Sequence, residues 1–142
     1  MNQPMKAERP YARFLEQLRS AGLRPTRQRL ALAKLLFNGK ARHVTAEVLH
    51  GESQEVGASV SLATVYNTLH QFTHAGLLKE IIVVSGRSYF DTNTLHHHHF
   101  YCEESGELSD IDAAEVAIGL LPEPPLGKKV SGIDVIVRVK RN

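Results

Sequence analysis

The sequence predicts an α+β protein whose front half is mainly helical and whose back half mixes short strands with irregular segments. Apolar residues recur at helical spacing between residues 13 and 78, and apolar and polar residues alternate at 133–140. The charge divides in the same way. Residues 1–88 carry 12 Lys and Arg against 6 Asp and Glu, whereas 89–142 carry 5 against 9. A basic front half indicates a polyanionic partner such as nucleic acid, with a solvated charged surface as the alternative.

Three helices are expected before residue 60. The first covers 13–21 and ends at Gly22. The second begins after Thr26, a good N-cap residue, and ends at the Asn38-Gly39 turn. The third begins near Thr45, and its periodicity predicts that Val48 and Leu49 point inward.

Residues 61–78 form the clearest helix of the sequence. Four apolar residues recur at helical spacing and predict a buried stripe: Leu62, Val65, Leu69 and Phe72. The opposite face is polar and carries Thr64, Asn67, Thr68 and Gln71. The segments 79–84 and 87–90 flank Ser85-Gly86 and predict a β-hairpin. This order of elements is that of a winged helix-turn-helix domain, predicted here over residues 1–88 with a hinge near 85–92.

The back half, residues 92–142, is predicted to be a small α/β domain. Strands are expected at 98–102, 107–111 and 133–140, with a short helix at 112–121 and an irregular Pro-rich segment at 121–127. A unit of this size is only marginally stable alone. Pairing with a second copy would bury its sheet, so a homodimer is expected.

The exposed face of the fourth helix has the side chains of a base-reading surface. Asn and Gln can pair bidentately with adenine, and Thr methyl groups can contact thymine. Tyr66 on the same helix can reach a phosphate or a thymine, and three arginines around the start of the second helix can hold phosphates or enter the minor groove. The candidate DNA contacts are Arg24, Arg27, Arg29, Ser61, Thr64, Tyr66, Asn67 and Gln71. The alternative is a polar helix face that meets only solvent.

The run His96–His99 is the most unusual feature of the sequence. On a strand, His97 and His99 share one face and His96 and His98 the other. Two imidazoles with a carboxylate suit a divalent transition metal such as Fe²⁺, Mn²⁺ or Zn²⁺. The candidate metal ligands are His43, Asp91, His97, His99 and Asp110.

Other interpretations of the histidine run stay open. His96 and His98 are candidates for a second metal site or for haem, because imidazole is a common axial ligand of haem iron. An exposed histidine-rich loop with weak metal affinity is the plainer alternative. A metal-dependent hydrolase is a remote one, since His97, His99 and Asp110 with an open coordination position would resemble a hydrolytic site.

Several classes of protein are excluded or disfavoured by composition. No apolar run approaches the roughly 20 residues of a membrane span. The first residues lack the apolar core of a signal peptide, so we expect a cytoplasmic protein without a membrane partner. The single cysteine, Cys102, excludes an intrachain disulfide and a structural Cys₄ zinc site.

Over residues 13–140 the sequence resembles the ferric uptake regulator superfamily of bacterial metal-sensing repressors. The motifs that carry the resemblance are Gly22-Leu-Arg-Pro-Thr-Arg-Gln-Arg29, His43-Val-Thr-Ala-Glu47, Ser61-Leu-Ala-Thr-Val-Tyr-Asn-Thr-Leu69, and the His-x-His before Cys102. Three further segments are most similar to the iron response regulator branch of alphaproteobacteria: Tyr89-Phe-Asp-Thr-Asn-Thr94, the histidine run with Phe100, and Leu121-Pro-Glu-Pro-Pro125. The peroxide-sensing branch is the near neighbour.

The resemblance implies a homodimer that binds an AT-rich, pseudo-palindromic DNA operator near iron and haem genes. It places the regulatory metal on the five ligands named above, the DNA-contacting helix on Ser61–Phe72, and haem sensing on the histidine run. Asn67 stands where iron uptake regulators usually carry Arg, so a different operator preference is expected. The expected function is therefore a metal- or haem-responsive regulator of iron homeostasis genes and not an enzyme, with a peroxide-sensing regulator as the alternative.

Overall fold

The computed structural model describes residues 11–83 and 86–142. The chain divides into two compact units, Met1–Thr94 and Leu95–Asn142. The division falls a few residues after the hinge expected near 85–92. Within the described residues, none of the helices has both the length and the apolar character that crossing a bilayer requires.

The first unit begins with three short helices whose ends are set by local sequence. They are α1 (Ala12–Ser20), α2 (Arg27–Phe37) and α3 (Ala46–Glu55). The predicted cap Thr26 is confirmed, since its hydroxyl accepts a hydrogen bond from the Arg29 backbone N–H, and the Thr45 hydroxyl caps α3 in the same way by accepting one from that of Val48. These bonds satisfy N–H groups that have no partner inside the helix.

Helix α4 (Leu62–His74) follows, and Ser61 caps it by accepting a hydrogen bond from the Thr64 backbone N–H at 3.1 Å. Strands β2 (Lys79–Ile82) and β3 (Ser88–Asp91) form the predicted antiparallel hairpin. The turn residues Val84 and Ser85 lie outside the described residues. A two-residue strand that the sequence did not predict, β1 (His43–Val44), pairs with β3, so the sheet order is β1-β3-β2.

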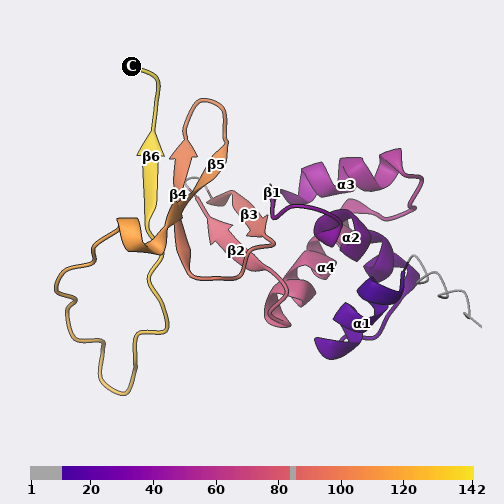
Figure 1. Ribbon diagram of the computed structural model, residues 1–142, viewed down its shortest axis with the longest axis horizontal. Coiled ribbons are helices and arrows are strands. Elements are labelled where there is room, and N and C mark those ends of the chain that lie inside the picture. The colour runs from indigo at the N-terminus through magenta and orange to yellow at the C-terminus, as the bar shows by residue number, and fades with distance from the viewer. Residues whose placement is uncertain (1–10, 84–85) are drawn as a thin grey trace, which may run out of the picture. The chain divides into compact units, whose positions relative to one another are not determined.

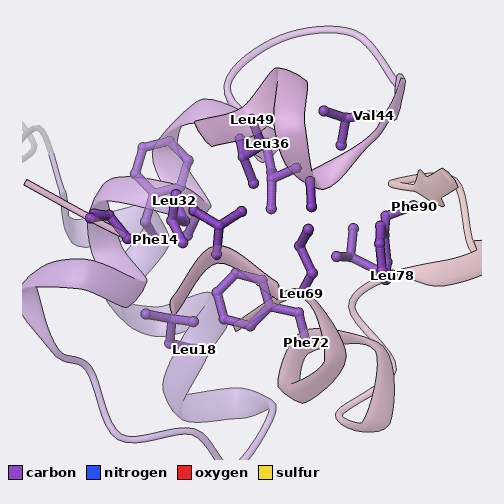
Figure 2. Packing of buried hydrophobic residues seen from close by; sticks show 14 residues of the cluster. Phe14, Leu18, Leu32, Leu36, Val44, Leu49, Leu69, Phe72, Leu78 and Phe90 are labelled. Carbon is purple, nitrogen blue, oxygen red and sulfur yellow. The ribbon is translucent and has the colours of Figure 1, made fainter. Parts of the chain in front are cut away.

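The four helices and β3 enclose one hydrophobic core, shown in Figure 2. The α4 residues Val65, Leu69 and Phe72 are completely buried, and Phe72 packs against the ring of Phe37 on α2 at a centroid distance of 6.2 Å. Close packing of this kind fixes the orientation of α4, because interior side chains interdigitate with few voids. The face of α4 that points away from the core is thereby determined.

Three details of the predicted helix faces are wrong. Val48 is half exposed and only Leu49 points inward, since Val48, two residues after buried Ala46, lies on the opposite face of α3. Leu62 is 38% exposed because it is the first residue of α4 and precedes the stripe that reaches the core. Thr68 is buried beside Leu69, so it does not belong to the polar face.

The second unit contains a three-stranded sheet in which β4 (His97–Cys102) lies between β5 (Leu108–Asp112) and β6 (Ile136–Val139) (Figure 1). Strand β4 is antiparallel to β5 and parallel to β6. The three predicted strands are confirmed. The predicted helix at 112–121 is wrong: the only helical residues there are a single 3₁₀ turn, Ala113–Glu115, and residues 116–135 are irregular, consistent with three prolines in this segment.

Candidate metal ligands and nucleic-acid interface

Two predicted metal ligands of the first unit lie opposite each other in its small sheet. His43 begins β1 and Asp91 ends β3, and the two residues are register partners. His43 Nε2 lies 3.2 Å from Asp91 Oδ2, while Asp91 Oδ1 accepts a hydrogen bond from the Asn93 backbone N–H at 2.9 Å. Asp91 is only 1% exposed, and a buried carboxylate is stable only with close partners. This pair offers one imidazole and one carboxylate.

Contacts of the neighbouring residues hold this pair in place. The Arg42 backbone N–H donates to the Thr92 hydroxyl, and the Thr92 backbone N–H donates to the Arg42 carbonyl. The Arg42 guanidinium forms a bidentate pair with Glu52 of α3, at 2.9 and 2.6 Å. That contact raises the pKa of Arg42 and fixes the chain directly before His43.

Three predicted ligands of the second unit also come together. His97 and His99 project from the same face of β4, with ring centroids 4.4 Å apart, and Asp110 on β5 is the register partner of His99. One oxygen of Asp110, Oδ1, lies 3.3 Å from His97 Nε2 and 3.5 Å from His99 Nε2. Alternation along β4 brings the two imidazoles together, and the register between β4 and β5 adds the carboxylate.

The hydrogen bonding of His97 fits a metal ligand. Its Nδ1 lies 2.6 Å from the Leu95 carbonyl oxygen, which only accepts, so Nδ1 must carry the proton. In the neutral ring, Nε2 then keeps its lone pair and faces an Asp110 oxygen that also carries lone pairs. Attraction between these atoms requires a proton or a metal cation. A ring N–H held by a carbonyl is the usual arrangement for a metal-binding histidine.

His98 lies on the other face of β4, as the alternation predicted, and His96 directly precedes the strand. Their rings are 4.9 Å apart at their centroids. His98 is buried, and its Nδ1 accepts a hydrogen bond from the Val135 backbone N–H at 3.0 Å. Neutral His98 therefore carries its proton on Nε2, which leaves no ring nitrogen with a lone pair for a metal or for haem iron while this hydrogen bond persists.

The predicted DNA contacts of α4 divide into structural and accessible groups. The Ser61 and Thr64 hydroxyls hydrogen-bond to each other at 3.0 Å as part of the helix cap. Asn67 and Gln71 are exposed, and Tyr66 is half buried. The accessible polar surface of α4 thus contains the two amide side chains that the sequence indicated.

The three predicted arginines have different surroundings. Arg24 and Arg27 are exposed before and at the start of α2. Arg29 instead contacts α4: its Nε and Nη2 donate to Gln71 Oε1 at 3.3 and 3.1 Å, and its Nη1 donates to the Arg24 carbonyl at 2.8 Å. Arg29 therefore connects the start of α2 to the exposed face of α4.

Sequence reasoning missed one residue at this face, Glu47. Its carboxylate accepts a hydrogen bond from the Tyr66 hydroxyl at 2.6 Å. The bond lowers the pKa of Glu47 and raises the pKa of Tyr66, because it stabilises a charged acceptor and a protonated donor. Glu47 lies in the first turn of α3, and nothing in the local sequence pattern pairs it with a residue of another helix.

Comparisons with known proteins agree with the motifs. The model of the ferric uptake regulator family matches residues 20–118. The ferric uptake regulation protein of Vibrio anguillarum is 36% identical over 94 residues, which cover 66% of this chain and 63% of that protein. The peroxide-responsive repressor of Staphylococcus aureus is 35% identical over 96 residues, covering 68% and 64%. The chain thus matches less than two thirds of the length of these curated relatives.

The tertiary structure agrees as well. The solved structure of the ferric uptake regulator from Pseudomonas aeruginosa with manganese has a TM-score of 0.67 and 28% identity, and the match covers 89% of this chain and 96% of that one. The predicted α+β fold with an N-terminal helical domain is therefore confirmed. The family model spans well over half of the 142 residues, and so the chain belongs to the ferric uptake regulator family.

Proposed function

We propose that this protein is a metal-dependent transcriptional regulator that binds DNA through α4 as a homodimer. The observation that carries the proposal is the group formed by His97, His99 and Asp110, in which one carboxylate oxygen faces two imidazole nitrogens. Family membership supports regulation of transcription over the metal-dependent hydrolase considered from the sequence. Action on a chromosomal operator would place the protein in the cytoplasm, and iron homeostasis genes are its proposed targets.

The proposed metal site uses all five predicted ligands. His43 and Asp91 would supply one imidazole and one carboxylate, and His97, His99 and Asp110 the rest. Only residues 92–96 link Asp91 to His97, so the chain allows at most about 20 Å between these two residues. A shared cation would supply positive charge to both groups and favour one arrangement of the two units.

The donor set also limits the identity of the metal. Imidazole with carboxylate ligands suits Fe²⁺, Mn²⁺ and Zn²⁺, and the ordinary affinity series favours Zn²⁺ among them. Manganese is named with the Pseudomonas aeruginosa relative. Mn²⁺ is therefore a practical probe, because it is stable in air and avoids the oxidation chemistry of Fe²⁺.

The DNA side of the proposal rests on the exposed face of α4. Asn67 and Gln71 would lie in the major groove, while Arg24 and Arg27 would neutralise phosphates or enter the adjacent minor groove. In a homodimer, two such helices would meet half-sites about one helical turn apart, or a multiple of that distance. An AT-rich, pseudo-palindromic operator suits this geometry and the exposed amide of Asn67.

The metal test compares two ligand variants with a neighbouring histidine. The full-length protein, freed of metal by a chelator, is titrated with Mn²⁺, and its binding to a duplex selected from a randomised pool is followed by fluorescence anisotropy. His97→Ala and His99→Ala should each weaken Mn²⁺ binding by at least about tenfold and abolish the effect of Mn²⁺ on duplex affinity. His96→Ala, which changes an exposed histidine directly before β4, should behave like the unmodified protein.

Two results would contradict the proposal. If His97→Ala and His99→Ala bind Mn²⁺ and respond to it as the unmodified protein does, the metal-sensing group is elsewhere. If Asn67→Ala leaves the preferred DNA sequence unchanged, Asn67 does not read the operator.

A peroxide-sensing regulator is the second candidate, because the Staphylococcus aureus relative carries that description. Exposure of the Fe²⁺-loaded protein to hydrogen peroxide distinguishes the two functions. Loss of duplex binding together with a mass increase on a ligand histidine would favour peroxide sensing. Haem sensing is the third candidate, and the Val135 hydrogen bond to His98 opposes it. A Soret absorption band that depends on His98 would restore it.

A further inference from the structure

Two side chains on the DNA-facing surface of α4 are each held by a charged residue from another helix. Gln71 is held by Arg29 of α2, and Tyr66 is held by Glu47 of α3. Both contacts lie within the first unit. They determine which atoms of Gln71 and Tyr66 can still form hydrogen bonds with DNA. The inference drawn from them rests on the proposed function, in which α4 reads bases.

The contact between Arg29 and Gln71 fixes the orientation of the Gln71 amide. A guanidinium group only donates hydrogen bonds, so the amide atom that faces its Nε and Nη2 must be the carbonyl oxygen. That oxygen accepts both bonds, at 3.3 and 3.1 Å. A third bond, from Nη1 to the Arg24 carbonyl, keeps the guanidinium from rotating away. The NH₂ group of Gln71 remains for the duplex, and it can only donate.

The contact between Glu47 and Tyr66 fixes the direction of the Tyr66 hydroxyl. An ionised carboxylate only accepts, so the hydroxyl hydrogen points to Glu47, at an oxygen–oxygen distance of 2.6 Å. The pKa of Glu47 is lowered and that of Tyr66 is raised by this bond, so both groups keep these protonation states at neutral pH. The Tyr66 oxygen retains lone pairs and can only accept a hydrogen bond from DNA.

We propose that Arg29 and Glu47 are positioning residues that set the hydrogen-bond polarity of the reading surface, a donor at Gln71 and an acceptor at Tyr66. Gln71 then cannot make the bidentate contact with adenine, which requires its carbonyl oxygen as well as its NH₂ group. It can donate a single hydrogen bond to acceptors such as guanine O6 and N7, thymine O4 or adenine N7, and so loses the added preference for adenine that a bidentate contact gives. Tyr66 cannot donate to a phosphate oxygen and selects the amino groups of adenine or cytosine.

The experiment measures base preference with the full-length, Mn²⁺-loaded protein. Duplexes that differ from the selected operator by one base pair at a time are compared by competition. Arg29→Met removes the guanidinium N–H donors and retains an unbranched apolar side chain at this position. Arg27→Met is the matched control, because Arg27 is an exposed arginine two residues earlier on the same helix. Thermal melting followed by circular dichroism verifies that each variant is folded.

Arg29→Met should shift the preference at one base pair of each half-site towards adenine by about fivefold or more, because the freed Gln71 amide can then pair bidentately. Arg27→Met should lower the affinity for all duplexes by the same factor. In a Gln71→Ala background, Arg29→Met should no longer alter the preference. Likewise, Glu47→Ala should change the preference only while Tyr66 is present, and the change should vanish in Tyr66→Phe.

The proposal is overturned if Arg29→Met lowers the affinity for all duplexes evenly, as loss of a phosphate contact would. It is overturned as well if Arg29→Met still alters the base preference in the Gln71→Ala background. It is also overturned if Gln71→Ala itself does not change the preference. These failures are distinguishable from a failure of the proposed function. If Asn67→Ala also leaves the preference unaltered, α4 does not read bases. If the preferences follow the prediction but Mn²⁺ has no effect on binding, only the metal dependence fails.

Discussion

Truncation of Leu69 tests whether the core holds α4 in its reading orientation. Leu69 is completely buried among residues of the other helices, so Leu69→Ala removes its apolar contacts and leaves a cavity. Buried Leu→Ala changes cost about 2–5 kcal/mol in the free energy of unfolding. Leu62 is the matched control: it is the same residue type on the same helix but is 38% exposed. Its truncation leaves no closed cavity and should cost about 1 kcal/mol.

The assay is urea unfolding followed by circular dichroism, at one protein concentration because the proposed dimerisation would make stability depend on concentration. With a denaturant slope of about 1–3 kcal/mol/M, Leu69→Ala should lower the midpoint by about 1 M or more, and Leu62→Ala by clearly less. Equal losses for the two variants would refute the assignment of Leu69 to the core and Leu62 to its edge. Unchanged stability of Leu69→Ala would refute the packing of α4 altogether.

Three other changes give direct readouts. Arg24→Ala should weaken binding to every duplex and reduce the slope of log affinity against log salt by about 1, as seen in anisotropy titrations; a changed base preference would contradict a phosphate role. Thr45→Ala should cost about 1 kcal/mol in urea unfolding, because the Val48 backbone N–H loses its cap, whereas Thr45→Ser should cost little. A hydrogen bond with Ser105 lowers the pKa of the Cys102 thiol, so Ser105→Ala should raise it and slow alkylation by iodoacetamide at neutral pH. Faster alkylation of Cys102 in Ser105→Ala would contradict the conclusion that Ser105 lowers the pKa of this thiol.

Local sequence was sufficient for most of the elements. Thr26 caps its helix as predicted, and Thr45 and Ser61 cap theirs in the same way, because a side chain that bonds the backbone three residues ahead acts within one turn. The alternation along 97–102 was equally reliable, since strand geometry alone places alternate residues on one face. The helix predicted at 112–121 is absent because a short helix is stabilised mainly by burying one face against other elements, and none of these residues is buried.

The candidate metal ligands were only partly visible in the sequence. The pairing of His97 and His99 follows from alternation. The juxtaposition of Asp110 with them depends on the register between β4 and β5, and that of His43 with Asp91 depends on the two-residue strand β1. A strand this short has no detectable pattern, because it forms only when β3 provides its hydrogen-bond partners.

The sequence by itself determined the helix starts, the alternation of the histidine run, the single cysteine and the family motifs, because each depends on neighbours a few residues apart or on composition. Only the tertiary structure decided that Arg29 holds Gln71 and that Glu47 holds Tyr66. These partners are 42 and 19 residues apart, and only the packing of α2 and α3 against α4 brings their side chains within hydrogen-bond distance.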